Sequence, residues 1–396
     1  MASASGVSPS TIAIAGPLHA VQPACYRLRM HPAGSRRTAT AELALVRRFP
    51  ALACLPRHAL TTLPTPVQPL DRLARRFGLP PLWIKRDDVS GPLYGGNKPR
   101  KLEWLLGAAA ARRRRGVITF GGIGTHHGLA TAICARDAGL KSVLVLLPQP
   151  LSDHVRHCLL LDQAVGAELH LAASVGGIVA QSLWRCAVAI GQGQPLAIIP
   201  TGGTSARGAI GYVNAGVELA EQVHAGAMPE PDTIFVPLGS GGTVAGLMLG
   251  CRLAGLRSRI VAVLVTDILP PSPQRLVGLA RATLRRLRRI APELPPVAMA
   301  PDDITIVRHH LGAGYGSVTD AGREAQRLLL EEEGIALETT YTAKCLAALL
   351  EVGATPTYRD RTLLFWNTFS SVDLSAVAGP LPDWHQLPPP FHRFFA

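Results

Sequence analysis

Lys98 lies in the stretch of the chain whose residue types most directly suggest chemistry. It follows a Gly-Gly-Asn turn and precedes an apolar helical pattern that contains Leu102 and Trp104. An amine held at such a loop-to-helix junction loses hydration, so its pKa falls and it becomes a nucleophile toward an aldehyde. Arg100 and Lys101 follow in the first helical turn, where the helix dipole disfavours cations. The three cations therefore predict a local anion, although Lys98 read alone could be one more basic residue.

A second motif, far downstream, predicts a phosphate site. Its residues follow an apolar strand pattern and open an apolar helix: Gly239, Ser240, Gly241, Gly242 and Thr243. Backbone N–H groups and hydroxyls at a helix start suit an anion. No acid stands about 20 residues on, at the next strand end, where a dinucleotide ribose would need one, so a monophosphate fits better. A tight strand–helix turn remains the alternative. A nucleophilic lysine plus a separate phosphate site predicts pyridoxal 5′-phosphate as cofactor.

Three further segments of the chain hold candidates for binding and proton transfer. Thr125 and His126 lie in a glycine-rich turn after the strand predicted at 117–120, a second anion site at a helix start. His126 and its neighbour His127 should point in different directions and have no third ligand at helical spacing, so we predict no metal. Tyr315 and Tyr341 lie in turns, and Thr342 begins a helix where its hydroxyl could reach a pyridine nitrogen.

Short apolar strands alternate with longer helices along most of the chain, which predicts an α/β fold with parallel sheets covered on both faces. We expect one helix from Lys98 to about Arg115. With 396 residues, the chain is long enough for two lobes. The predicted division is a disordered or non-native tail at 1–45, with order from near Leu52, a large cofactor-binding lobe at 46–100 and 209–396, and a small lobe at 101–208.

The composition of the chain limits which partners and which compartment we predict for the protein. The net charge of +13 comes largely from the N-terminal arm and from arginine runs at 112–115 and 281–289, the second of which has amphipathic helical spacing. No basic platform interleaved with aromatic residues is present, so we predict no nucleic-acid partner. No apolar run reaches the roughly 18 residues of a membrane span. Seven scattered cysteines without a Cys-x-x-Cys pair indicate a reducing compartment, and we predict a cytoplasmic protein.

Together these motifs resemble the 1-aminocyclopropane-1-carboxylate deaminase / D-cysteine desulfhydrase family of pyridoxal-phosphate enzymes, over roughly residues 55–375. The most specific segment runs from Lys85 to Glu103 and contains Lys-Arg-Asp-Asp and Gly-Gly-Asn-Lys. The resemblance implies the tryptophan-synthase-β-like fold (fold type II), with two open parallel-sheet lobes and the cofactor on Lys98. It places Thr125 at a family serine and His126 at the asparagine beside the cofactor's O3′.

The same resemblance implies the remaining roles. The phosphate turn maps to residues 239–243, Tyr315 maps to a tyrosine after Gly-x-x, and Tyr341 and Thr342 map to a Tyr-(Glu/Thr)-Gly-Lys motif. Family members that cleave the cyclopropane ring have a sequence that resembles Tyr-Glu at that motif. A threonine offers the ring nitrogen only a neutral hydrogen bond, which suits α-proton removal followed by β-elimination. The segment at 367–371 departs from the family's His-Thr-Gly-Gly.

The predicted enzyme is thus a lyase or deaminase acting on a small amino acid, and we expect a homodimer. Thr125 would hold the substrate carboxylate, and Lys98, Tyr315 or Tyr341 would move the α-proton. D-Cysteine would give pyruvate, sulfide and ammonia. The alternatives are ring opening of the cyclopropane amino acid, a cofactor-binding protein without turnover, and a basic nucleic-acid binder.

Overall fold

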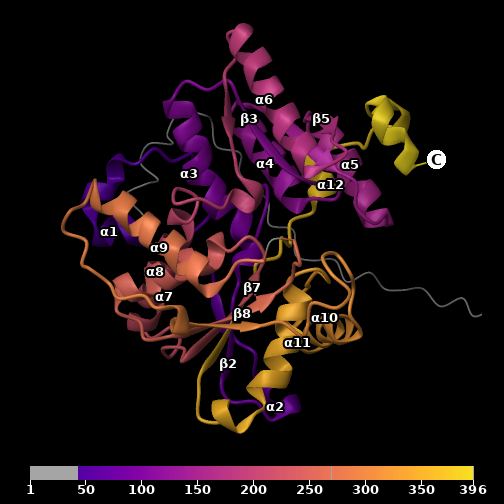
Figure 1. Ribbon diagram of the computed structural model, residues 1–396. Helices are drawn as coiled ribbons and strands as arrows, with labels where there is room; N and C mark the ends of the chain where they lie inside the picture. The colour runs from indigo at the N-terminus through magenta and orange to yellow at the C-terminus, as the bar shows by residue number, and fades with distance from the viewer. Residues whose placement is uncertain (1–42, 269, 396) are drawn as a thin grey trace, which may run out of the picture. The chain divides into compact units, whose positions relative to one another are not determined.

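The computed structural model describes residues 43–268 and 270–395 (Figure 1). Most of the predicted tail, residues 1–42, lies outside the described residues. The last part of that tail is packed, because Leu45 is buried and its backbone N–H donates to Oδ1 of Asn214 at 3.0 Å. Helix α1 (Ala44–Arg48) follows, so order extends further toward the N-terminus than the expected start near Leu52.

Two sheets organise the described chain. The six-stranded sheet has the order β1-β2-β10-β7-β8-β9, and only its edge strand β1 is antiparallel to its neighbour. Its strands are β1 (Val67–Pro69), β2 (Leu82–Lys85), β7 (Thr233–Leu238), β8 (Arg259–Leu264), β9 (Ile304–Val307) and β10 (Leu363–Trp366). The four-stranded sheet is wholly parallel, in the order β5-β4-β3-β6. Its strands are β3 (Gly116–Gly122), β4 (Lys141–Leu147), β5 (Glu168–Leu171) and β6 (Leu196–Ile198).

Helices cover these sheets (Figure 1). Besides α1 they are α2 (Asp71–Phe77), α3 (Asn97–Ala111), α4 (His126–Asp137), α5 (Asp153–Ala164), α6 (Val175–Gly191), α7 (Ile210–His224), α8 (Gly242–Ala254), α9 (Pro273–Arg288), α10 (Asp320–Glu333), α11 (Thr342–Gly353) and α12 (Leu374–Ala378). Short 3-10 helices span Pro50–Cys54, Asp87–Val89, Thr201–Gly203, Pro301–Asp303, Pro356–Tyr358, Trp384–Gln386 and Pro389–Phe394.

Alternation of side chains along each strand builds a core on both faces of the six-stranded sheet. In β7, Ile234 and Val236 pack with residues of α7, α8 and α9, whereas Phe235 packs with residues of α10 and α11. Burial on both faces explains why these strands are nearly continuous apolar runs in the sequence. The fold class inferred from the alternating pattern is therefore confirmed.

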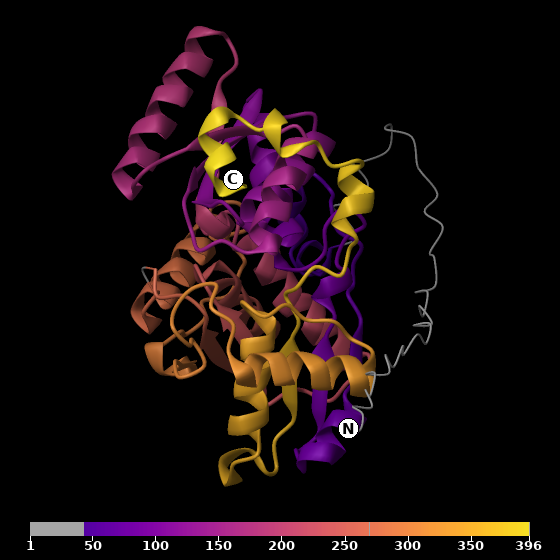
Figure 2. The same ribbon diagram turned by 90° about the vertical axis from the view of Figure 1, so that its right-hand side faces the viewer.

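The strands of the four-stranded sheet lie within the range predicted for the small lobe, and those of the six-stranded sheet lie within the ranges predicted for the large lobe. The C-terminal segment does not follow this division. Leu387, Phe391 and Phe394 pack in the core that covers the four-stranded sheet, together with Leu129 of α4 and Leu159 of α5. Figure 2 shows this yellow segment lying along the helices of that sheet. The end of the chain, placed by prediction in the large lobe, therefore packs with residues of the smaller one.

Other local predictions need adjustment. Helix α3 ends at Ala111 rather than near Arg115, because the backbone turns at Arg113, which has a φ of 53°. The amphipathic helix expected at 281–289 forms the second half of α9, and strand β9 had no predicted counterpart. None of the described helices combines the length and the hydropathy that a membrane span requires.

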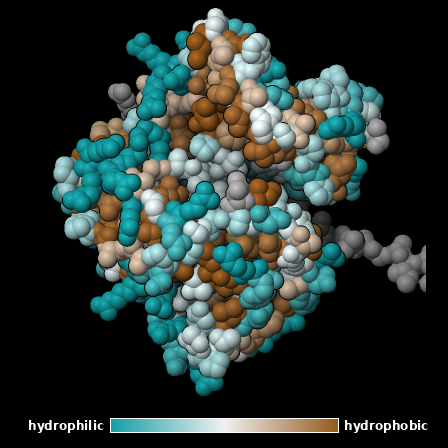
Figure 3. Space-filling view, in the orientation of Figure 1, coloured by the Kyte–Doolittle hydropathy of each residue, from teal (hydrophilic) through white to brown (hydrophobic). Residues whose placement is uncertain are grey.

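Helix α6 keeps an apolar face in solvent. Val179, Leu183, Trp184 and Ile190 are each more than half exposed, and so is Ile198 on the edge strand β6. The helix stands at the upper left of Figure 2, and hydrophobic residues gather over the upper part of the surface in Figure 3.

Candidate active site

The glycines before Lys98 are fixed by close packing against the loop after β10. Gly96 has a φ of 76°, and a Cβ there would lie 2.3 Å from the carbonyl oxygens of both Thr368 and Phe369. The backbone N–H of Gly95 donates to Oγ of Ser370 at 2.9 Å. Only glycine tolerates both this conformation and this approach, so the Gly-Gly pair positions the start of α3.

Lys98 occupies the first turn of α3, and its amine is suited to act as a nucleophile. Burial lowers its pKa to about 8, and the negative charge of Glu338 offsets part of that effect. Nζ lies 5.3 Å from the centroid of the Tyr341 ring. A buried lysine with a lowered pKa is partly uncharged near neutral pH and can attack a carbonyl group.

The three cations of this turn do not share one anion. Nη2 of Arg100 lies 2.8 Å from Oδ1 of Asp87 and 2.9 Å from Oε1 of Glu218, so its charge is balanced by buried protein carboxylates. The expectation that Arg100 seeks a ligand is wrong for this reason. Lys101 is also buried, and no hydrogen bond or ion pair of its amine is found within the part of the chain that the structure describes. Burial, with a further contribution from Lys98, lowers the pKa of Lys101 to about 7.

The predicted phosphate turn connects β7 to α8. Gly241 has a φ of 90°, and a Cβ on Gly242 would lie 2.9 Å from Oγ1 of Thr204. The hydroxyls of Ser240 and Thr204 are 2.6 Å apart, which joins this turn to the 3-10 helix at Thr201–Gly203. The backbone N–H groups at the start of α8 therefore lie near the hydroxyls of Ser240 and Thr204. An anion site at a helix start has this arrangement of donors.

The phosphate turn and the Lys98 helix are in direct contact. Nδ2 of Asn97 donates to Oγ1 of Thr243 at 3.1 Å. A Cβ on Gly239 would lie 3.6 Å from Cε1 of Tyr341, the ring over which the Lys98 amine lies. The structure thus brings together two motifs that are far apart in the sequence.

Tyr315 and Tyr341 form a hydrogen-bonded pair, with their hydroxyl oxygens 2.7 Å apart. Burial raises the pKa of both phenols, and that of Tyr341 is raised well above its usual value. Both side chains therefore stay protonated at neutral pH and can donate a proton, but they are poor bases.

Thr342 is fully buried, and its hydroxyl is engaged by Glu338. Oγ1 of Thr342 donates to Oε1 of Glu338 at 3.0 Å and accepts from the Glu338 N–H at 3.2 Å. The Glu338 carboxylate also accepts the backbone N–H groups of Thr340, Tyr341 and Thr342, so it caps α11. Contact of Thr342 with a pyridine nitrogen stays a prediction.

Thr125 caps α4, and its side chain accepts the N–H of Gly128 at 3.4 Å. The next two residues diverge: Nδ1 of His126 lies 2.9 Å from the hydroxyl of Tyr94, whereas Nε2 of His127 lies 3.1 Å from Oγ1 of Thr119. Burial is the main cause that lowers the pKa of both imidazoles to about 3, so both rings are neutral.

A cavity opens at the Lys98 amine. Three predicted residues line it: Lys98, His126 and Tyr341. The lining residues that the prediction did not single out are Tyr94 and Glu338, whereas Thr368, Phe369 and Ser370 belong to the segment at 367–371 that departs from the family. Thr125, Tyr315 and Thr342 lie in contact with lining residues or next to them in the chain, but do not line the cavity themselves. Glu338 lies four residues before the predicted helix start at Thr342, and this spacing is the feature of the sequence that could have identified it.

Similarity to known proteins agrees with this geometry. The family model described as "Pyridoxal-phosphate dependent enzyme" matches residues 59–368. The chain belongs to this family. Nocardicin C-9′ epimerase of Nocardia uniformis subsp. tsuyamanensis is 36% identical over 340 residues, covering 84% of this chain and 98% of that protein. D-Cysteine desulfhydrase of Klebsiella pneumoniae (strain 342) is 32% identical over 324 residues, covering 80% and 94%.

The family assignment extends to solved structures. The crystal structure of an ACC deaminase homologue superposes with a TM-score of 0.70 at 28% identity, covering 88% of this chain and all of that one. This confirms the resemblance to the deaminase and desulfhydrase enzymes, the fold type II architecture and the dependence on pyridoxal phosphate.

The residues present fit that cofactor. The charge of Lys98 contributes to the lowered pKa of the buried Lys101, and of these two amines Lys98 lies nearer the start of the helix joined to the phosphate turn. We assign the aldehyde-binding role to Lys98 and the phosphate-binding role to residues 239–243. These residue roles remain predictions.

Proposed function

We propose that this enzyme removes the α-hydrogen of a small amino acid and eliminates its β-substituent, as the name D-cysteine desulfhydrase describes for a relative. The observation that carries the proposal is the Lys98 amine lying over the Tyr341 ring, beside the hydrogen-bonded tyrosine pair. Pyridoxal phosphate, when bound, withdraws electrons from the α-carbon of an amino acid and makes its hydrogen acidic.

The protein groups divide into a base and an acid. Nζ of Lys98 has the lowered pKa expected of a base that takes the α-hydrogen. The phenols of Tyr315 and Tyr341 stay protonated, so we assign the pair to proton donation to the leaving thiolate. The start of α4, capped by Thr125, would receive the substrate carboxylate. With water, D-cysteine would yield pyruvate, hydrogen sulfide and ammonia.

Epimerisation is the second candidate, because this chain is 36% identical to the nocardicin epimerase and covers 98% of that protein. The first step would be the same. The proton would then return to the opposite face of the α-carbon, from Tyr341, and no bond to the β-substituent would break. Ring opening of the cyclopropane amino acid is the third candidate.

One experiment separates the three outcomes. The purified holoenzyme is incubated in D2O with D-cysteine, L-cysteine or 1-aminocyclopropane-1-carboxylate, and pyruvate, sulfide, 2-oxobutanoate and α-deuterium are measured. Elimination gives pyruvate and sulfide, epimerisation gives α-deuterium with inversion, and ring opening gives 2-oxobutanoate. Release of pyruvate from neither cysteine would overturn the proposed elimination.

Variants test the two roles. Lys98→Ala should abolish both product formation and α-hydrogen exchange. Tyr341→Phe should lower elimination by about 10²- to 10⁴-fold and retain exchange, because only the acid is lost. Tyr358→Phe is the matched control, since Tyr358 packs against Phe235 and lies outside the cavity lining.

We also propose that the enzyme is a homodimer in a reducing compartment. The exposed apolar face of α6 (Val179, Leu183, Trp184 and Ile190) supports self-association, because an apolar face of this kind is usually covered. The described cysteines (Cys54, Cys134, Cys158, Cys186, Cys251 and Cys345) are free thiols, as a cytoplasmic location would require.

A further inference from the structure

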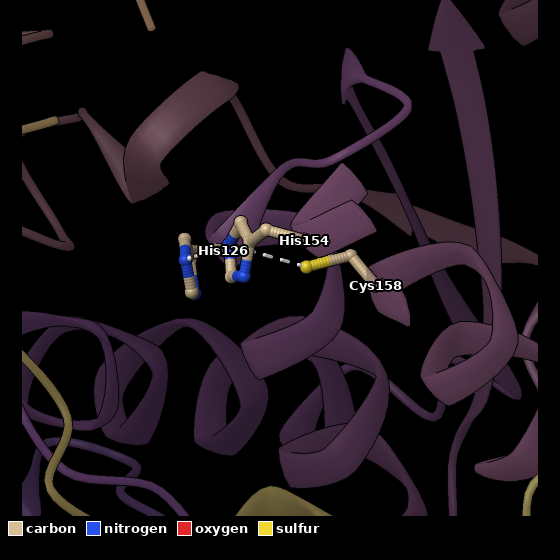
Figure 4. A group of neighbouring side chains, drawn as sticks. All are labelled: His126, His154 and Cys158. Carbon is tan, nitrogen blue, oxygen red and sulfur yellow. Dashed lines mark hydrogen bonds between the residues drawn. The ribbon is translucent and has the colours of Figure 1, made fainter. Parts of the chain in front are cut away.

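Three side chains beside the cavity form a cluster that the proposed chemistry does not use. His126 comes from the first turn of α4, and His154 and Cys158 come from α5 (Figure 4). Residues four apart on a helix share one face. One face of α5 therefore presents an imidazole and a thiol to the imidazole of His126, in the His-x-x-x-Cys spacing that suits two ligands of one metal ion.

Two of the three distances within the cluster are close to those between ligands of a tetrahedral zinc ion. Nε2 of His126 and Nε2 of His154 are 3.0 Å apart, and Sγ of Cys158 lies 3.6 Å from Nε2 of His154. Bond lengths of about 2.05 Å to nitrogen and about 2.3 Å to sulfur predict separations of about 3.3 and about 3.6 Å. All three ligand atoms lie within 4.8 Å of one another.

The surroundings orient the ligands. The hydroxyl of Tyr94 lies 2.9 Å from Nδ1 of His126 and so holds the ring with Nε2 toward α5. Metal-binding histidines usually have such a second partner on the other ring nitrogen. Cys158 is buried, whereas His154 is exposed, which gives an ion a route from solvent.

A buried acid lies one turn further along the same helix face. Asp162 is fully buried, and neither of its carboxylate oxygens has a hydrogen-bond partner among the residues that the structure describes. A buried polar group without a partner is costly, and a cation bound at Cys158 would lie one helical turn away from this carboxyl group.

We infer that His126, His154 and Cys158 bind one Zn²⁺ ion. The sequence prediction of no metal considered ligands near His126 along the chain, whereas the partners come from α5. Binding replaces the thiol proton of Cys158, which leaves to solvent, and forms two Zn–N bonds and one Zn–S bond. Three protein ligands leave a fourth position open, which is the pattern of catalytic rather than structural zinc.

The inference does not depend on which amino acid the enzyme uses. His126 also lines the Lys98 cavity, so an occupied site would fix this ring at the cavity wall. The alternative is a plain hydrogen-bonded chain from Tyr94 through both histidines to Cys158, with no affinity for metal. The two differ in a measurable quantity, the number of zinc ions bound per chain.

The test measures zinc affinity and stoichiometry of the untagged holoenzyme, by titration calorimetry with Zn²⁺ and by elemental mass spectrometry after dialysis. The wild type should bind one ion tightly. His154→Ala and Cys158→Ser should each weaken that affinity by at least about 100-fold, because loss of even a second-shell partner costs about 10- to 100-fold. His154 is exposed, so its variant should fold normally; circular dichroism checks the fold of both.

Two matched variants serve as controls. His157→Ala removes a histidine of α5 that is not in the cluster, and His309→Ala disrupts the separate group of His309, His310 and Glu351. Both should keep the tight site. The inference is overturned if folded wild type binds no stoichiometric zinc, if the His154→Ala protein binds it as tightly as the wild type, or if His309→Ala alone removes it.

Discussion

The protonation of Lys98 can be measured in the apoenzyme, and the structure sets its expected value. Burial lowers its pKa to about 8. At a pH of about 7.5, roughly a quarter of such an amine is uncharged, against about 0.1% for an ordinary lysine, so the reactive fraction is about 200-fold larger. Labelling of Lys98 by a limiting amine-directed acylating reagent should therefore rise with a midpoint near pH 8.

Removal of the Glu338 charge tests the cause of this value. The carboxylate raises the pKa of Lys98 against the effect of burial, so Glu338→Gln should move the labelling midpoint to lower pH. The amide oxygen still accepts an N–H group at the start of α11, which preserves part of the cap. Glu351→Gln, at the exposed far end of α11, should leave the midpoint unchanged.

Peptide mass spectrometry measures the labelling of Lys98 across pH 6–10, with exposed Lys141 as the reference in the same digest. The reasoning is refuted if the Lys98 midpoint equals that of Lys141. It is also refuted if Glu338→Gln raises the Lys98 midpoint, because loss of a negative charge cannot favour the ammonium form.

Further variants have expected outcomes. Gly96→Ala should lower the free energy of unfolding by at least about 2 kcal/mol in urea melts, because its Cβ would meet the carbonyl of Thr368 at a positive φ. Gly139→Ala, with a positive φ but open space, should cost only about 1 kcal/mol. Arg100→Met should cost about 3–5 kcal/mol by the same measurement, because it leaves the buried Asp87 carboxylate without its ion-pair partner. Leu183→Glu should convert a dimer to a monomer in light scattering; an unchanged mass would exclude α6 from the interface.

The sequence predicted the features that depend on neighbouring residues. Alternating apolar segments indicated the parallel sheets, since a strand buried on both faces must be apolar throughout. The turn before Lys98 and the turn at 239–243 were recognisable because each needs glycines at fixed offsets. These motifs were sufficient to predict the family and the cofactor, which the comparisons confirm.

Tertiary structure decided which side chains meet. Ser370 holds the Lys98 turn from 275 residues away, and Glu218 balances Arg100 across 118 residues. No periodicity in the sequence encodes such pairs, because they depend on how helices and strands from different parts of the chain pack. The same reason explains why Glu338 and the partners of His126 were missed, because Glu338 meets the Lys98 cavity, and α5 meets His126, only through the packing of separate elements.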